Sequence, residues 1–167
     1  MPGRVTAVFQ EQRRDGNEEP DAVTVLLGYE KGVHEGLLVT VKAGVVSLET
    51  QQLRYWVRGT EGSWLKLCLD VQEDQLKAGL KPGDKGFGVE PEERSGWVTK
   101  MEDGKPVKSV LRNVEPETYG ALYGKFGEAI LKNEEALVPV KAAEARDVLR
   151  IIEAAKESAK TGRTVEL

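Results

Sequence analysis

Two groups of residues have the types and the spacing that binding chemistry needs. The first alternates along two predicted strands: Thr40 and Lys42 on one, and Arg54, Trp56 and Arg58 on the other. Side chains two residues apart on a strand point to the same side, and Trp and Arg are enriched at the centres of interfaces. We expect this face to contact a second subunit, forming a homodimer, or to bind a small anionic or polyol ligand. The alternative is a solvated face on which the Trp56 indole lies under basic side-chain stems.

The second group belongs to a long loop with glycines at positions 79, 83, 86 and 88. Long loops that carry aromatic residues often overhang a ligand pocket. We therefore expect Phe87, Glu90 and Trp97 to line such a pocket, and a loop that only caps the sheet edge is the alternative. The acidic run over residues 90–93, beside Arg94, is typical of a solvated charged segment rather than of paired catalytic carboxylates.

The sequence contains no complete catalytic constellation, so a catalytic residue stays unassigned. Its single cysteine, Cys68, and its single histidine, His34, exclude an internal disulfide and a His/Cys zinc site. Cys68 lies in an apolar run and is expected to be a small buried hydrophobe, whereas His34 is expected at the exposed tip of a turn. No spacing supports a pairing of these two as nucleophile and base, and the residues indicate no metal site.

Length and composition favour a single soluble domain. The 167 residues carry 24 Lys and Arg against 28 Asp and Glu, a net charge of −4, which disfavours nucleic-acid binding. The sequence lacks an apolar run long enough for a membrane span and shows no signal-peptide pattern. We expect a cytoplasmic protein that has no membrane association.

Hydrophobic alternation in the first half predicts an antiparallel meander, because the connections are too short for helical crossovers. The expected strands cover residues 4–9, 22–27, 37–42, 53–58, 97–101 and 107–110, the last two joined by an Asp-Gly turn. One side of the sheet is nearly all apolar and should lie under the C-terminal helices; its residues are Val5, Ala7, Phe9, Val23, Val25, Leu27, Leu37, Val39, Val41, Leu53, Tyr55 and Val57.

Three-to-four residue spacing predicts two helices in the second half, after a short one over residues 70–79. Pro116 is a plausible first residue of the earlier helix. The later helix has Lys141 at its expected N-cap and Gly162 as its stop. The order of elements predicts an α+β fold, an open and mostly antiparallel sheet with C-terminal helices on one face and the other face free for a dimer or a ligand.

Five sequence blocks, in this order, resemble the C-terminal domain of the glucose-fructose oxidoreductase, inositol dehydrogenase and rhizopine-catabolism (Gfo/Idh/MocA) family. They are Pro2-Gly-Arg-Val-Thr-Ala7, Val57-Arg-Gly-Thr-Glu-Gly-Ser-Trp64, residues 70–79, Phe87-Gly-Val-Glu-Pro91 and the run 145–162. The resemblance extends over nearly the whole chain, and we expect residues 1–167 to be one such domain. The last block and the Arg58-Gly-Thr-Glu-Gly-Ser63 segment are the more specific ones.

The resemblance implies an oxidoreductase whose NAD or NADP lies in a separate N-terminal Rossmann domain, with a Glu-Lys-Pro lysine there and an Asp and a His on an upstream helix. This sequence has no match to those parts, since Glu30-Lys31 is followed by Gly32, and we expect no cofactor site in the chain itself. Its expected role is substrate binding and oligomerisation. The alternatives are a stand-alone cofactor-free isomerase, cyclase or small-molecule binder on the same scaffold, and a non-catalytic interaction module.

Overall fold

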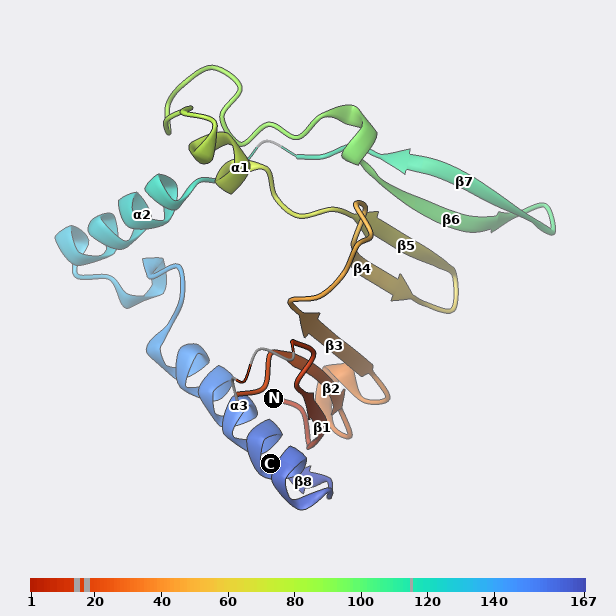
Figure 1. Ribbon diagram of the computed structural model, residues 1–167. Coiled ribbons are helices and arrows are strands. Elements are labelled where there is room, and N and C mark those ends of the chain that lie inside the picture. The colour runs from red at the N-terminus through yellow and green to blue at the C-terminus, as the bar shows by residue number, and fades with distance from the viewer. Residues whose placement is uncertain (14–15, 17–18, 115) are drawn as a thin grey trace. The chain divides into compact units, whose positions relative to one another are not determined.

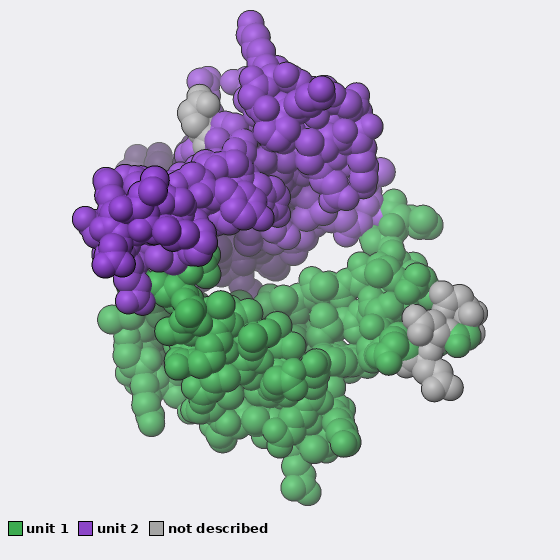
Figure 2. Space-filling model, turned by 90° about the vertical axis from the view of Figure 1, so that its left-hand side faces the viewer, with its two compact units in different colours: residues 1–48, 140–167 green, residues 49–139 purple. Residues whose placement is uncertain are grey.

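The structure is a computed structural model, and it describes residues 1–13, 16, 19–114 and 116–167. The chain forms two compact units, one of residues 1–48 and 140–167 and the other of residues 49–139 (Figure 2). Each unit contains one four-stranded sheet whose strand pairs are all antiparallel. The predicted α+β class with open antiparallel sheet and C-terminal helices is therefore confirmed.

The first unit is a sheet of strand order β3-β2-β1-β8 with one long helix, α3, packed against β1 (Figure 1). Its elements are β1 (Arg4–Gln10), β2 (Ala22–Gly28), β3 (Leu38–Gly44), α3 (Ala142–Thr161), β8 (Val165–Glu166) and the 3-10 turn η1 (Gly32–His34). The C-terminal segment lies beside the N-terminal strand, because β8 pairs with β1 at Arg4 and Val5.

The core of the first unit lies between α3 and the predicted apolar side of the sheet. Val5 and Ala7 of β1 are buried with Ala154 and Ala155 of α3, and Leu27 of β2 joins them. Two adjacent alanines in the helix have no bulk beyond Cβ, so the helix backbone can lie close to the strand. This packing confirms the assignment of the β1 and β2 residues to the covered face.

Both ends of α3 form where the sequence predicts them. At its start the Lys141 N–H donates to the Glu144 Oε2 atom at 2.9 Å, which satisfies one of the free amides of the first turn. At its end Gly162 takes φ +67°, a left-handed conformation that glycine adopts at little steric cost. The predicted polar loop after β1 lies partly outside the described residues, at positions 14, 15, 17 and 18.

The second unit is a sheet of strand order β4-β5-β6-β7 with two shorter helices. Its elements are β4 (Leu53–Arg58), β5 (Gly62–Leu67), α1 (Gln72–Lys77), η2 (Glu92–Arg94), β6 (Gly96–Glu102), β7 (Lys105–Leu111), α2 (Tyr119–Lys132) and η3 (Glu135–Leu137). The turn between β6 and β7 is Asp103-Gly104, at φ +50° and +73°, which confirms the predicted hairpin.

Several details differ from the sequence-based expectations. Strand β5 was not predicted, and Leu53, Tyr55 and Val57 are about half exposed rather than covered by helices. The physical reason is that α3 packs on β1 of the first sheet, while α2 packs on η3 of its own unit. The α2 helix begins at Tyr119 rather than at Pro116, because Thr118 is the N-cap and its Oγ1 accepts the Ala121 N–H at 3.4 Å.

Cys68 is a further correction. Its side chain is only partly buried, and its backbone has φ +65°, a left-handed conformation at the end of β5. Its N–H donates to the Gln52 carbonyl at 2.8 Å, which holds this turn of the chain beside the start of β4. None of the helices within the described residues is long and apolar enough to cross a bilayer.

Candidate functional site

Strand register divides the second sheet into two faces of different chemistry. Trp56 on β4 is opposite Leu65 on β5, Leu65 is opposite Trp97 on β6, and Trp97 is opposite Val110 on β7. Residues paired across strands project to the same side. The four side chains therefore form one continuous apolar row, and we call the side that carries it the indole face.

Basic side chains lie over both indoles of the indole face. The Cζ atom of Arg58 lies 4.9 Å from the centre of the Trp56 ring, and the Nζ atom of Lys108 lies 3.8 Å from that of Trp97. Each contact fixes an aromatic ring by a cation–π interaction. Trp56 nevertheless remains 56% exposed and Val110 70% exposed. The row is therefore an exposed apolar surface whose two indole rings are held in place by neighbouring basic side chains.

The opposite face carries a cavity, and Lys66 of β5 is one of the residues that line it. The Lys66 ammonium donates to Glu90 Oε2 at 2.6 Å, to the Arg94 carbonyl at 2.7 Å and to Asn113 Oδ1 at 3.2 Å. All three of its protons are thus used. The side chains of Lys66 and Glu90 are only 15% and 12% exposed, so this ion pair is largely shielded from water. One lysine connects a strand, the glycine-rich loop and the segment after β7.

Aromatic rings form one wall of this cavity. Tyr55 and Trp64 stack with their ring centres 5.6 Å apart and their planes 19° from parallel. The Trp64 Nε1 atom and the Asn113 Nδ2 atom are the two buried side-chain polar atoms, within the described part of the chain, that have no hydrogen-bond partner. Both residues line the same cavity, so two unsatisfied N–H donors are concentrated at one place.

Contacts between distant segments hold the cavity walls together. Gly88 lies so near Pro116 that a Cβ atom at Gly88 would come within 2.9 Å of the proline ring. The Gln75 side chain accepts the Gly88 N–H at 2.6 Å and donates to the Gly86 carbonyl at 3.1 Å, which ties the loop to α1. The cavity has a volume of about 460 Å³ and is lined by Tyr55, Trp64, Lys66, Asp70, Gln72, Gly88, Glu90, Gly96, Leu111, Arg112, Asn113, Val114, Pro116 and Glu117.

The structure separates the residues predicted on the glycine-rich loop. Glu90 lines the cavity, as expected of a pocket residue, and it is not part of a solvated run. Glu92, by contrast, is exposed and lies 3.9 Å from Arg112, as expected of a solvated segment. Phe87 is buried and does not line the cavity, and Trp97 lies on the indole face.

The residues predicted on the first face are divided between the two units. Thr40 and Lys42 lie on β3 of the first unit, opposite Leu26 and Thr24 of β2, on the side of that sheet away from α3. Arg54, Trp56 and Arg58 are exposed on β4 of the second unit, and the Arg54 Cζ atom lies 5.1 Å from the Tyr55 ring centre. A binding role for these five residues stays a prediction.

Sequence reasoning missed Lys66, Trp64, Tyr55 and Asn113, which build the cavity with Glu90. The signal for Lys66 was present, since it is the one charged residue inside an otherwise apolar run over residues 64–69. A buried lysine needs acceptors, and those acceptors come from residues 24 to 47 positions further along the chain. No local pattern connects them.

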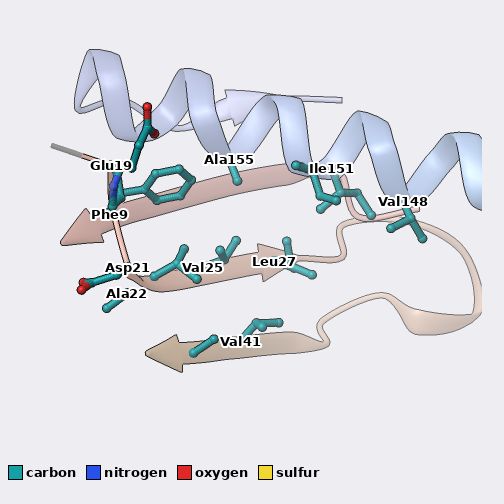
Figure 3. Close-up of a pocket in the computed structure, with 14 residues that line it drawn as sticks. Phe9, Glu19, Asp21, Ala22, Val25, Leu27, Val41, Val148, Ile151 and Ala155 are labelled. Atoms are coloured by element: carbon teal, nitrogen blue, oxygen red, sulfur yellow. The ribbon is translucent and has the colours of Figure 1, made fainter. Parts of the chain in front are cut away.

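The first unit carries a second concavity of about 710 Å³, which is a groove rather than a polar site (Figure 3). Val25, Leu27 and Val41 project from β2 and β3 toward the side of α3, and Val148 and Ile151 project from the helix. Glu19 and Asp21 stand at one end. Asp21 is already engaged, because its carboxylate accepts the N–H groups of Gln12 and Arg13 at 2.6 and 3.0 Å.

Comparison with known families gives a match over the complete chain. Residues 1–167 match the family described as "Oxidoreductase family, C-terminal alpha/beta domain", the Gfo/Idh/MocA family. The chain belongs to this family. The resemblance stated from the five sequence blocks is therefore confirmed, and the comparisons support neither the isomerase or cyclase alternative nor the interaction module.

Curated relatives include scyllo-inositol 2-dehydrogenase (NADP(+)) IolW of Bacillus subtilis, which is 35% identical over 167 residues, all of this chain and 44% of that protein. The Escherichia coli oxidoreductase YdgJ, described as uncharacterized, is 30% identical over 154 residues, which are 92% of this chain and 41% of that one. The chain thus spans a little under half the length of the curated relatives it matches.

Solved structures of two bacterial proteins share the fold along the complete chain. The Bacillus subtilis protein yvaA gives a TM-score of 0.86 at 34% identity, with 100% of this chain and 46% of yvaA covered. The Yersinia pestis protein YPO2259 gives a TM-score of 0.86 at 28% identity, with 100% and 44% covered.

Proposed function

We propose that this chain is the substrate-shaping and subunit-pairing domain of an NAD(P)-dependent oxidoreductase. The observation that carries the proposal is the contrast between the two faces of the second sheet. One face is an exposed apolar row suited to another protein surface, and the other holds a partly buried polar cavity suited to a small molecule. Family membership supports oxidoreduction as the reaction class, because a relative that aligns with the whole of this chain is named a dehydrogenase.

The indole face has the composition of a two-fold symmetric interface. Large aromatic side chains and arginine are the residues that contribute most to binding energy at interface centres. A symmetric contact would place the row of one subunit against the same row of its partner. Arg58 and Lys108 would then shield the rim of the apolar row, and homodimerisation through this face is the result we expect.

The nicotinamide cofactor is proposed to bind outside the residues described. Dinucleotide sites of the Rossmann type need parallel strands joined by helices, and every strand pair within the described ranges is antiparallel. Hydride transfer is the chemistry that the cofactor supplies when it is bound. The part proposed for this chain is to hold the substrate and to pair the subunits.

Light scattering of the purified chain tests the pairing. We expect a dimer whose mass does not change with NADH or NADPH, and we expect Trp56→Glu to convert it to a monomer. Val57→Glu is the matched control, because Val57 is 55% exposed on the same strand but projects to the opposite face. A monomeric wild-type chain, or equal dissociation by both variants, would contradict the proposal.

A further inference from the structure

We infer that pairing through the indole face takes up small anions from solution, because a row of basic side chains runs beside the apolar row and neither copy of the face offers it a carboxylate. The inference rests on the subunit-pairing half of the proposed function and adds a dependence on salt. A contact between complementary charges weakens as salt is added. The dimer proposed for this chain should instead become tighter.

A second row of paired residues lies directly beside the apolar row of the indole face. Arg58 of β4 is opposite Ser63 of β5, which is opposite Thr99 of β6. Thr99 is in turn opposite Lys108 of β7. Each of these residues is two positions along its strand from a member of the apolar row, so all of them project to the same side. We call them the basic row, because a cation stands at each end with two hydroxyl groups between.

The indole face offers these two cations no carboxylate. Neither row contains Asp or Glu, and the next residues of this face toward the β6–β7 turn, Met101 and Pro106, are uncharged. Within the described residues, neither Arg58 nor Lys108 forms an ion pair, and Glu61 in the turn after β4 does not reach Arg58. Both cations are exposed, so ions of the solvent balance their charge.

Two-fold symmetry prevents a second copy from supplying a carboxylate. A symmetric contact brings the same surface of both subunits together, whichever way the axis runs across the sheet. Each subunit therefore meets a face whose paired rows again contain only Arg58 and Lys108 as charged residues. Like charges brought together at an interface cost free energy, and anions held between them lower that cost. Because the dimer then binds anions better than the monomer does, anions favour pairing.

The hydroxyl groups of the basic row suit the same anions. Ser63 stands beside Arg58 and Thr99 stands beside Lys108, each one strand away. Neighbouring strands are about 4.8 Å apart, so an anion at either cation is within reach of a hydroxyl that can donate to it. Each subunit thus contributes two pairs of a cation and a hydroxyl, while the apolar row supplies the attraction between the subunits.

Sedimentation velocity of the purified chain over a range of protein concentrations tests the inference, with sodium chloride as the source of anions. The dissociation constant of the dimer should fall by about threefold or more between about 10 and 100 mM salt, because the Debye length shortens over this range from about 30 to about 10 Å. Salt also strengthens the burial of apolar surface. The dependence on salt is therefore compared between charge variants as well as measured in wild type.

Arg58→Gln and Lys108→Gln each remove one cation of the basic row, and each should make the dissociation constant less dependent on salt. The double variant should lose most of the dependence. Lys100→Gln is the matched control, because Lys100 is exposed on β6 opposite Gly62 and projects to the other face. It changes the net charge of −4 by the same amount as either single variant, and it should respond to salt as wild type does.

The outcomes separate this inference from the pairing proposal. A dimer whose dissociation constant does not change with salt, or rises with it, overturns the inference and leaves pairing standing. Equal loss of the salt dependence in Lys100→Gln and Arg58→Gln would assign the effect to the net charge of the chain and would overturn the inference as well. A chain that stays monomeric at every salt concentration contradicts the pairing proposal itself.

Discussion

The Ser158 hydroxyl of α3 accepts the backbone N–H of Ala7 in β1 at 2.9 Å, and Ser158 is only 1% exposed. Strand β8 begins at Val165, which is opposite Val5, so the pairing of β8 with β1 does not reach Ala7. The helix therefore supplies the acceptor that a longer edge strand would have supplied. A buried polar group without a partner is costly, and this one bond satisfies a hydroxyl and an amide together.

Ser158→Ala should lower the free energy of unfolding by about 1–2 kcal/mol, because it leaves the Ala7 amide buried without an acceptor. Urea denaturation followed by circular dichroism measures the loss. Thr161→Ala is the matched control, since its hydroxyl bonds to the Glu157 carbonyl on the exposed side of the same helix, and it should shift stability by less than about 0.5 kcal/mol. Equal losses in the two variants would contradict the assigned role.

Cys68→Gly should raise the free energy of unfolding by about 0.5–1 kcal/mol. Glycine adopts the left-handed conformation without the steric cost that a side chain brings, and this gain exceeds the conformational entropy that glycine adds to the unfolded state. The basis is the φ of +65° at Cys68. Thermal unfolding measures the gain. Ser63→Gly, at the second residue of β5, is the control and should be destabilising, because its backbone is extended. A loss of stability in Cys68→Gly would show that the side chain contributes more than the strain costs.

The sequence predicts well those elements whose signals are local. Helix α3 was predicted from its apolar stripe and from Gly162, and the β6–β7 hairpin from Asp103-Gly104; each depends on residues only a few positions apart. Strand β5 was missed because its sequence does not alternate between apolar and polar residues, since the adjacent Trp64 and Leu65 are both apolar. Trp64 faces the cavity while Leu65 joins the indole face, so no alternation marks the strand.

The candidate site could be predicted only in part, for a related reason. Glu90 was expected in a pocket from its loop, and the cavity has it there, but Trp97 was grouped with it by sequence proximity. Strand register instead places Trp97 in the row of Trp56, on the other face. The acceptors of Lys66 are distant in the sequence, so its role follows from the tertiary path of the chain.

Lys66→Met should destabilise the chain by about 3 kcal/mol, because it leaves the Glu90 carboxylate largely buried without its cation. The double variant Lys66→Met with Glu90→Leu should recover much of that loss, since it removes both charges. Urea denaturation of the two variants measures the coupling. Lys77→Met is the control: Lys77 pairs with Glu73 at 2.8 Å, but both side chains are largely exposed, and water screens such surface pairs so that they add little to stability. A double variant as unstable as Lys66→Met alone would argue against the ion pair as the cause.

Acid should weaken the first unit through Asp21. The Asp21 carboxylate accepts the Gln12 backbone N–H, and it also accepts hydrogen bonds from the charged Arg13. These interactions, the Gln12 bond above all, lower the pKa of the Asp21 carboxyl below its ordinary value of 3.8. A folded-state pKa below the unfolded one stabilises the fold above pH 3.8, and the contribution is lost as the pH falls below that value toward the lowered pKa. Asp21→Asn removes the titrating group but retains the side-chain shape. Unfolding temperatures measured from pH 7 down to pH 2 should therefore fall less steeply in Asp21→Asn than in wild type, with the difference concentrated below about pH 4. Parallel curves for the two proteins would remove Asp21 as a source of acid sensitivity.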